Sequence, residues 1–326
     1  MTTGLRVLAQ ELRKDWNSLQ KHLTSKLSFL LIIAVFCHLF IVRGQGLPAD
    51  AFDWMIVTEV RLPRTLLGLL TGFVLALTGA VFQTIFSNKL ADSFTLGIAG
   101  GASLGSAIGV VLGVSAAGLS ITGSLMTLVI VIVLTQLCFR SNQRIGMVLF
   151  GMFINFFCSS ALYGLVIFWP GRTRQLLNYL FGSIGTAGWQ DIAILLPVTV
   201  FGTIGLLMLS RAVSIVANGE TIARGVGVND RQTTYIALTI ASVMTAVLIS
   251  MTGIIGFVGL IIPQLFNGIK KLLTIGLMGG LSVIMADFLG NNMITPIQLP
   301  VSVPLSLAGL PLLLMIILKK GYGGER

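Results

Sequence analysis

Ionisable side chains are rare in the long apolar stretches of this sequence, and only Asp287 and His38 lie inside them away from the last residue at either end. A charged group inside a bilayer costs about 2.5 to 3.5 kcal/mol at a helix centre, so each is a functional hypothesis by default. We expect Asp287 to face the interior of a helical bundle and to accept hydrogen bonds from a neighbouring helix. His38, near the outer end of its stretch, is expected to be interfacial rather than a ligand.

Enzymatic chemistry finds little support in the residue types. Gly101-Ala102-Ser103 has a Gly-x-Ser form, but a serine nucleophile needs a general base within hydrogen-bond reach, and the only histidine in an apolar stretch is His38. The four-residue repeat Gly97/Gly101/Gly105/Gly109 indicates close helix packing instead. The chain has no Gly-x-x-x-x-Gly-Lys-Ser/Thr phosphate loop, so we expect no catalytic site in it.

The cysteines Cys37, Cys138 and Cys158 stand alone in apolar runs, without the spacing of a metal site or a disulfide framework. We therefore expect no metal site, and we interpret all three cysteines as core or lipid-facing residues.

Composition places these residues in a membrane. The chain is 55% hydrophobic and 10% charged, whereas soluble domains carry roughly 25% charged residues. One crossing needs about 20 mostly apolar residues, and such stretches follow one another along the chain. They are 27–43, 65–86, 94–113, 119–139, 146–169, 191–210, 233–252, 254–267, 273–291 and 303–318. The predicted fold class is an all-α integral membrane protein with about ten transmembrane helices, the eighth being short for a full crossing.

Orientation follows from the basic residues, which are retained on the cytoplasmic side in short loops. Both termini are predicted to be cytoplasmic, with residues 1–26 as an amphipathic segment that carries no signal-peptide cleavage site and residues 27–326 as one membrane domain. The basic residues that this topology leaves on the outer face are Arg43, Arg61, Arg64, Arg172 and Arg174. The net charge of +10 therefore reflects membrane topology; a nucleic-acid partner is not expected, because that needs a basic face on a soluble domain.

Two functional classes remain open on residues alone. Scarce intramembrane carboxylates and the lack of an obvious internal repeat weigh against an ion-coupled secondary transporter, but an ATP-independent transporter or channel stays an alternative. The run Arg61-Leu62-Pro63-Arg64 opens the second stretch from outside, with Pro63 suited to a first helical turn. Its arginines could hold a carboxylate-bearing partner or anchor lipid headgroups.

Motifs spread along nearly the whole chain resemble one family. They are Arg61-Leu62-Pro63-Arg64, Gly72, Leu75-Ala76, Gly79, Gln83, Asn88, Leu90-Ala91, Leu96-Gly97, Phe181-Gly182-Ser183, Trp189, the stretch from Glu220 to Gly227, Gly256-Phe257-Val258-Gly259-Leu260-Ile261-Ile262-Pro263, Ala286-Asp287, Leu299-Pro300-Val301 and Gly309-Leu310-Pro311. In combination they resemble the FecCD-type permeases that import iron chelates, haem and vitamin B12.

That resemblance implies a type II ABC importer permease in a bacterial cytoplasmic (inner) membrane. It implies three kinds of partner: a second permease subunit, two ATPase subunits, and a periplasmic or lipid-anchored substrate-binding protein. The ATPase subunits would bind ATP and Mg²⁺, so this chain is expected to bind no cofactor. The family's docking arginines correspond to Arg61 and Arg64. The expected cargo is a ferric siderophore, with haem or vitamin B12 as alternatives.

The resemblance also implies a cytoplasmic coupling loop at about 211–232, with two short helices that lie in a groove of the ATPase. The coupling residues are expected to be Asn218, Gly219, Glu220, Ala223, Arg224, Gly225 and Gly227. The turn after the second stretch corresponds to the cytoplasmic gate, which makes Asn88 and Leu90 candidates for closing the path.

The sequence departs from the family pattern at several positions. Lys89 and Ser93 stand where proline is usual, Gln264 and Asn267 replace His and Arg, Asn291 replaces an expected docking arginine, and Gln298 replaces Glu. The missing charges favour a heterodimer over a homodimer, with the other permease subunit supplying them.

Overall fold

The computed structural model describes residues 26–40, 50–139, 143–185, 187–266, 271–292 and 298–321. The predicted amphipathic segment 1–26, apart from Lys26, lies outside this part of the chain, as do Arg43 and Asn267. The described residues form helices and connections, without a strand.

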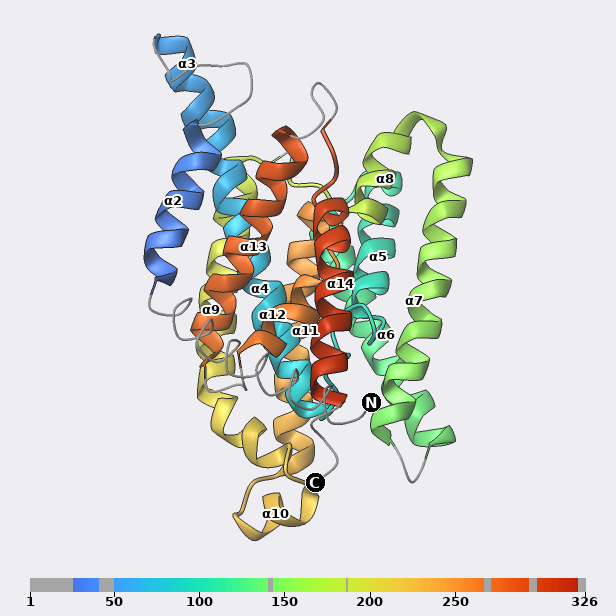
Figure 1. Ribbon diagram of the computed structural model, residues 1–326. Helices are drawn as coiled ribbons and strands as arrows, with labels where there is room; N and C mark the ends of the chain where they lie inside the picture. The colour runs from blue at the N-terminus through green and yellow to red at the C-terminus, as the bar shows by residue number, and fades with distance from the viewer. Residues whose placement is uncertain are drawn as a thin grey trace, which may run out of the picture.

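Each predicted span falls on one helix of a bundle (Figure 1), which confirms the all-α membrane fold. The helices that coincide with the ten predicted spans are α2 (Leu27–Phe40), α4 (Leu62–Ile85), α5 (Ile98–Leu112), α6 (Ala116–Cys138), α7 (Gln143–Phe168), α9 (Trp189–Val216), α11 (Asp230–Thr252), α12 (Val258–Leu265), α13 (Leu272–Asn292) and α14 (Ser302–Gly321). Six helical segments of the described chain are long and apolar enough to cross a membrane by length and composition: those containing α4, α6, α7, α9, α11 and α13.

The second span is longer than predicted. α3 (Ala51–Ile56), a π-helical turn η1 (Val57–Arg61) and α4 form one continuous 35-residue helix. Pro63 therefore lies inside a helix rather than in its first turn, which corrects the sequence prediction. Proline lacks an N–H and crowds the carbonyl four residues earlier, and the π turn just before it changes the hydrogen-bond register, with the Leu62 N–H bonded to the Val57 carbonyl.

Helix α4 is the centre of the bundle, and glycines let its neighbours approach its backbone. A Cβ at Gly72 would lie 2.0 Å from the Gly279 carbonyl oxygen of α13, and one at Gly79 would lie 2.2 Å from that of Gly259 in α12. No side chain fits such contacts. Close backbone approach through small residues is how membrane helices pack.

The glycine repeat of α5 also packs against neighbours, as predicted. A Cβ at Gly105 would lie 2.1 Å from the Leu119 carbonyl oxygen of α6, and one at Gly97 would lie 2.9 Å from that of Gly151 in α7. Ser103 is buried and donates its hydroxyl to the Tyr179 carbonyl at 3.0 Å. Its role here is structural.

One helix at the outer end was not predicted. After α7, a 3₁₀ turn η2 (Pro170–Arg172) leads into α8 (Thr173–Phe181), which lies beside α5 and α7 (Figure 1). The chain then runs back against the end of α11, where the Ser183 N–H bonds to the Thr252 carbonyl at 2.7 Å. The Ser302 hydroxyl at the start of α14 donates to the Phe181 carbonyl. These contacts tie α8, α11 and α14 together at one end.

The eighth crossing is made of two parts. Residues 253–257 continue from α11 without forming a helix, and α12 has only eight residues. Its two limits contact opposite ends of the bundle: the Ile254 N–H bonds to the Tyr179 carbonyl, and Gln264 bonds to the Lys89 carbonyl. The short eighth stretch of the sequence therefore corresponds to a part-helical crossing.

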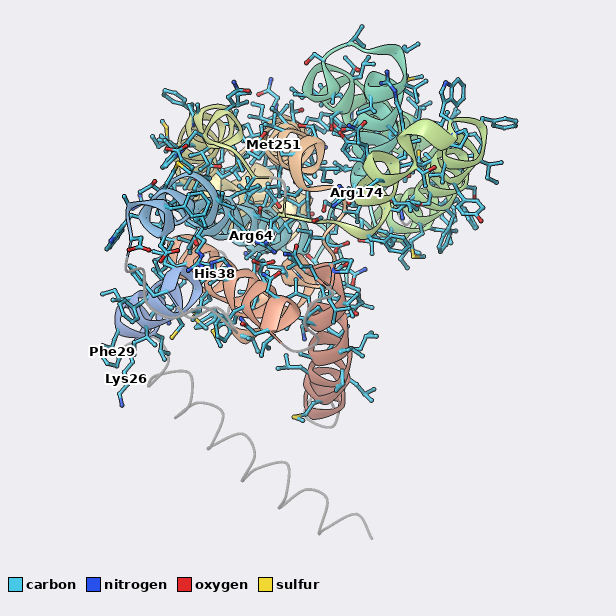
Figure 2. The ribbon with its side chains drawn as sticks, turned by 90° about the horizontal axis from the view of Figure 1, so that it is seen from above. Lys26, Phe29, His38, Arg64, Arg174 and Met251 are labelled. Carbon is cyan, nitrogen blue, oxygen red and sulfur yellow. The ribbon has the colours of Figure 1, made fainter. Side chains whose placement is uncertain are left out.

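The two ends of the bundle differ in what they carry. α3 and α8 lie at one end, and the short helix α10 (Glu220–Gly225) lies at the other, toward which the start of α2 and the end of α14 also point (Figure 1). The positive-inside rule makes the α10 end cytoplasmic. Large apolar side chains such as Phe157, Phe201 and Met208 are exposed on the sides of the bundle, and Phe29 projects outward in the view from above (Figure 2), as expected for a lipid-facing surface.

Candidate functional site

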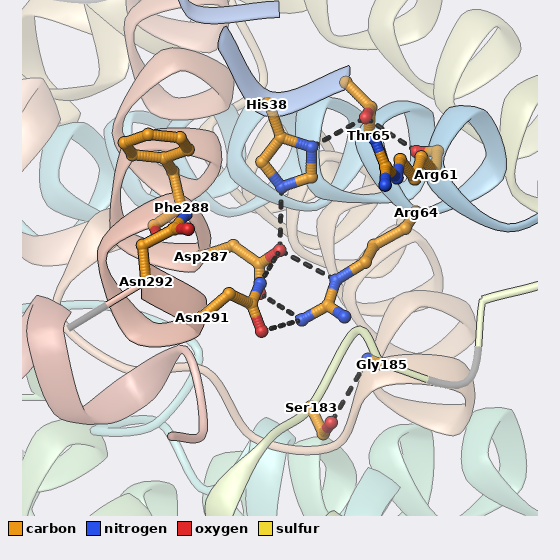
Figure 3. A network of polar contacts seen from close by, with 10 residues as sticks. All are labelled: His38, Arg61, Arg64, Thr65, Ser183, Gly185, Asp287, Phe288, Asn291 and Asn292. Atoms are coloured by element: carbon orange, nitrogen blue, oxygen red, sulfur yellow. Dashed lines mark hydrogen bonds and ion pairs between the residues drawn. The ribbon is translucent and has the colours of Figure 1, made fainter. Parts of the chain in front are cut away.

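The outer end of the bundle holds a buried group of polar side chains from three helices. We call it the outer polar cluster: His38 of α2, Arg64 and Thr65 of α4, and Asp287 and Asn291 of α13 (Figure 3). Asp287 is fully buried at its centre. The cluster joins residues that are up to 249 positions apart in the sequence.

Arg64 and Asp287 form the strongest pair of the cluster. Nε and Nη2 of Arg64 lie 2.8 Å from Oδ2 and Oδ1 of Asp287, a two-pronged arrangement that adds geometric specificity to the ion pair. Asn291 completes it, because Arg64 donates to the Asn291 amide oxygen at 2.9 Å and the amide nitrogen donates to Asp287 at 3.1 Å. The departure to asparagine at position 291 therefore lies inside this cluster.

His38 is buried in the cluster, not interfacial, which corrects the sequence expectation. Its Nε2 lies 2.8 Å from Oδ2 of Asp287, and its Nδ1 lies 2.7 Å from the Thr65 hydroxyl. The carboxylate accepts hydrogen bonds only, so Nε2 is the donor. His38 thus anchors α2, a helix with several exposed apolar side chains, to α4 and α13.

The two arginines expected to dock a binding protein are both partly buried at the outer end. The Arg64 side chain is 16% exposed, and it lies between helices in the view from above (Figure 2). Arg61 donates to the Leu39 carbonyl at 2.9 Å. By contrast, Arg172 and Arg174 of η2 and α8 are exposed.

At the cytoplasmic end, residues 217–229 form the α9–α11 connection. It is shorter than the predicted loop at 211–232, because α9 continues to Val216 and α11 begins at Asp230. The connection contains one short helix, α10, rather than the two expected. Asn229 caps α11 by accepting from the Gln232 N–H, so the chain returns to the membrane directly.

Glycines bracket α10. Gly219 and Gly227 have φ values of +113° and +78°, which side-chain-bearing residues rarely adopt, and a Cβ at either position would meet nothing within 4 Å. Backbone conformation, and not crowding, therefore requires glycine at these two positions.

The other predicted coupling residues occupy different surroundings. Asn218 donates to the Ser214 carbonyl at 2.8 Å. Ala223 is fully buried, whereas Arg224 and Gly225 are exposed. Glu220 is the first residue of α10, and its side chain lies outside what the structure describes.

Sequence reasoning missed two residues, Ile222 of α10 and Val226 in the turn after it. Ile222 and Val226 are 54% and 65% exposed, although they lie at the end of the bundle that the positive-inside rule places in water. They are four positions apart, a spacing that places side chains on one helical face. An apolar pair at this spacing in an otherwise polar loop was the available signal.

The α4–α5 connection (86–97) holds the predicted gate residues. The Asn88 side-chain oxygen accepts from the Leu90 N–H at 3.0 Å, which shapes the turn, and the Leu90 side chain is 44% exposed. Gln264, where the family has histidine, donates to the Lys89 carbonyl at 2.9 Å. The turn is therefore shaped by two side-chain hydrogen bonds, one to Asn88, which matches the family pattern, and one from Gln264, which departs from it.

In the described part of the chain, no three His, Cys, Asp or Glu side chains gather as a metal site would require. Thr65, His38 and Asp287 form a hydroxyl–imidazole–carboxylate chain, but all three are buried and the Thr65 hydroxyl donates to the Arg61 carbonyl at 2.7 Å, so these contacts hold helices together. The arrangement combines a rigid charged cluster at one end and an exposed helix at the other.

Comparisons with known proteins agree on one family. The model of the FecCD transport family matches residues 26–319. The ABC transporter permease YvrB of Bacillus subtilis, an uncharacterized protein, is 31% identical over 90% of this chain and 87% of its own length. A Helicobacter pylori protein provisionally named an iron chelatin transport system permease is 32% identical over 81% of this chain and 83% of its length. The vitamin B12 import permease BtuC of Citrobacter koseri is 29% identical over 90% and 93%.

Solved structures lead to the same result. One reported as an inward-facing conformation of a proposed metal-chelate type ABC transporter matches with a TM-score of 0.81 at 25% identity, over 92% of this chain and 99% of its own. PsaBC of Streptococcus pneumoniae, with a TM-score of 0.56 at 13% identity, shares the fold. Because the family model covers most of the sequence and the relatives align over most of their lengths, this multi-pass membrane protein belongs to the FecCD transport family.

Proposed function

We propose that this chain is the permease subunit of a binding-protein-dependent ABC importer that carries a ferric siderophore across a bacterial cytoplasmic membrane. The observation that carries the transport mechanism is α10, which presents Ile222 and Val226 beyond the cytoplasmic end of the bundle. Apolar side chains exposed to water together mark a protein-binding surface. A short helix with an apolar face suits a groove in an ATPase subunit.

The surroundings of α10 favour transmission of movement. α10 contacts α9 and α11, and its Ala223 is buried while Ile222 and Val226 are exposed. Gly219 and Gly227 allow it to turn on both sides. In this proposal Asn218, Gly219, Glu220, Ala223, Arg224, Gly225 and Gly227 form the coupling element, together with Ile222 and Val226.

At the outer end, the proposed partner is a substrate-binding protein with acidic docking residues. Arg61 and Arg64 remain proposed docking residues, although both side chains already make hydrogen bonds within the chain. Arg172 of η2 and Arg174 of α8 add exposed positive charge. Complementary charge steers encounter and fixes register more than it adds affinity.

The remaining parts of the proposal concern the assembly. A second permease subunit, in a heterodimer rather than a homodimer, would complete the path, and Asn88 and Leu90 would close it on the cytoplasmic side. Two ATPase subunits would bind ATP and Mg²⁺, and this chain would bind no cofactor. Purification of an active complex containing only this permease chain would contradict the heterodimer.

The substrate follows from relatives with two kinds of names. Those provisionally named iron chelatin permeases and those named vitamin B12 permeases have similar identity to this chain, so vitamin B12 is one alternative cargo, and haem is another that the family resemblance implies. The alternative from a different class is an ATP-independent transporter.

A test in cells with and without this chain would measure uptake of radiolabelled iron, offered as ferric siderophores and as haem, beside labelled vitamin B12. Loss of uptake of one ferric siderophore alone supports the proposal. Loss of uptake of vitamin B12 alone, or of haem alone, overturns the siderophore assignment.

The coupling proposal has its own test. Gly225→Pro removes an N–H and breaks α10, and Glu220→Ala alters its first residue. We expect both variants to insert normally and to lose ATP-driven uptake while ATP hydrolysis continues. Unchanged uptake in both would favour the ATP-independent alternative.

A further inference from the structure

Ser87 has a backbone conformation that usually belongs to glycine. α4 ends in a Schellman motif, in which the Ser87 N–H bonds to the Thr84 carbonyl and the Asn88 N–H bonds to the Gln83 carbonyl, each at 3.2 Å. The residue at the position of Ser87 is left-handed in this motif, and its φ is +47°. A side chain in this region is uncommon and strained.

The Ser87 hydroxyl makes a contact that glycine could not make. Its oxygen donates to the Ala217 carbonyl at 3.2 Å. Ala217 is the first residue after α9, and Asn218 and Gly219 follow it before α10 begins at Glu220. The bond therefore joins the turn that carries Asn88 and Leu90 to the start of the α9–α11 connection, 130 positions later in the chain.

α12 also bonds to the end of α4 and to this turn. Gln83 donates to the Gly259 and Leu260 carbonyls, both at 3.0 Å, and Gln264 donates to the Lys89 carbonyl at 2.9 Å. These bonds join the turn to the core of the bundle. Ser87 joins it to the segment that leads to α10.

We propose that Ser87 is a positioning residue that transmits displacement of α10 to the cytoplasmic gate within one chain. When α10 is displaced with its partner, the Ala217 carbonyl moves with the end of α9, and the Ser87 hydroxyl draws the turn bearing Leu90 along with it. The strained conformation is retained because the link needs a side chain at this position. This inference rests on the proposed function, since it assumes that α10 is driven by an ATPase.

The decisive variant is Ser87→Gly, because it separates strain from linkage. Glycine adopts a φ of +47° freely, so this variant should be at least as thermally stable as the parent while it lacks the hydroxyl. Ser87→Ala lacks the hydroxyl and keeps the strain, so it should be less stable. Thr84→Ala is the matched control, because the Thr84 hydroxyl donates to the Ala80 carbonyl of its own helix.

The readout is the gate itself, in the full complex reconstituted in vesicles. Leu90→Cys, in a background with Cys37, Cys138 and Cys158 replaced by serine, would be labelled with a membrane-impermeant maleimide from the cytoplasmic side. Labelling rates would be compared without nucleotide and with ATP and Mg²⁺. Because one neutral hydrogen bond biases an equilibrium by roughly 2- to 10-fold, the nucleotide response should shrink by that factor in Ser87→Gly and Ser87→Ala. ATP hydrolysis and the Thr84→Ala response should be unchanged.

The outcomes separate the two proposals. If the parent complex responds to nucleotide and Ser87→Gly responds equally, the link through Ser87 is wrong while the proposed coupling stands. If the parent does not respond to nucleotide at all, the proposed coupling fails, and the inference fails with it. A purely structural role would lower the stability of Ser87→Gly together with its response, which also contradicts the proposal.

Discussion

The outer polar cluster and the α9–α11 connection are built in opposite ways. In the cluster, one buried carboxylate holds Arg64, His38 and Asn291 by four bonds of 2.8 to 3.1 Å and so fixes α2, α4 and α13 to each other. In the connection, one short helix stands between two positive-φ glycines, with apolar side chains exposed.

The difference indicates where the molecule is rigid and where it can move. Buried charges held by several hydrogen bonds tolerate little displacement, because any separation leaves a charge uncompensated in low dielectric. Segments with few buried contacts open at low free-energy cost. We infer that the outer ends of α2, α4 and α13 move as one body, and that conformational change starts at the cytoplasmic end.

Breaking the cluster should have the largest effect. Asp287→Ala leaves Arg64 and His38 without their carboxylate, and removal of one partner of a buried ion pair costs about 3 to 5 kcal/mol. We expect a strong loss of folded protein, measured as the thermal unfolding midpoint in detergent and as the yield of inserted protein.

The double variant Arg64→Met/Asp287→Leu is the control for that prediction. Replacing a buried pair by apolar side chains of similar size is often neutral, so the double variant should recover the part of the lost stability that comes from the unpaired Arg64, while His38 still lacks its acceptor. Equal instability of single and double variants would show that the cluster acts through something other than charge compensation.

The sequence reveals more of this architecture than of its contacts. The spans follow from apolar length, which the membrane imposes on each of them, and the short eighth stretch already indicates an incomplete helix. The extension of α4 beyond Pro63 and the short helix α8 are not predictable this way, because their outer turns are too polar to count as spans. The partners of Asp287 are equally hidden: that His38 reaches it across 249 positions depends on tertiary packing.

The cytoplasmic end shows the same limit on a smaller scale. Family resemblance implies a coupling segment there, but it does not single out which of its apolar side chains are exposed. The sequence shows Ile222 and Val226 as an apolar pair in an otherwise polar loop, but only the structure shows that both side chains are exposed.

The second prediction concerns this exposed pair. Ile222→Asp combined with Val226→Asp should abolish co-purification of the ATPase subunits, because truncating a buried interface anchor commonly costs more than about 1 kcal/mol and a charge costs more. The fold should survive, since both side chains are exposed in the isolated chain. Thr221→Asp, on the same helix and also exposed, is the matched control, and equal loss in that variant would mean that the apolar pair is not the contact.

A smaller effect is expected at the outer face, where the two pairs of arginines can be compared directly. Arg172→Glu/Arg174→Glu should slow association of the binding protein by about several-fold at low salt and reduce the salt dependence of the association rate, as is usual when charges at the rim of an interface are changed. The fold should be unaffected, because both side chains are exposed. Arg64→Glu should instead destabilise the protein, because it places a second carboxylate beside Asp287. Unchanged association rates after reversal of Arg172 and Arg174 would leave docking to other residues.

The smallest effect is expected at Asp92, a buried carboxylate in the α4–α5 connection. Burial raises the pKa of the Asp92 carboxyl, opposed in part by hydrogen bonds from the backbone and side chain of Thr95. A pKa raised in the folded state means that the folded protein favours the neutral acid, so this group stabilises the fold below its unfolded pKa and loses that contribution as pH rises through its folded pKa. Asp92→Asn keeps an oxygen for the Thr95 N–H, which Asp92 now accepts at 2.8 Å, and carries no charge to desolvate. The variant should therefore melt slightly higher than the parent at neutral pH, with the difference shrinking toward acidic pH. The thermal unfolding midpoints of both proteins across that pH range measure this difference. If the parent is the more stable at neutral pH, the ionised carboxylate has a partner that stabilises it by more than its burial destabilises it.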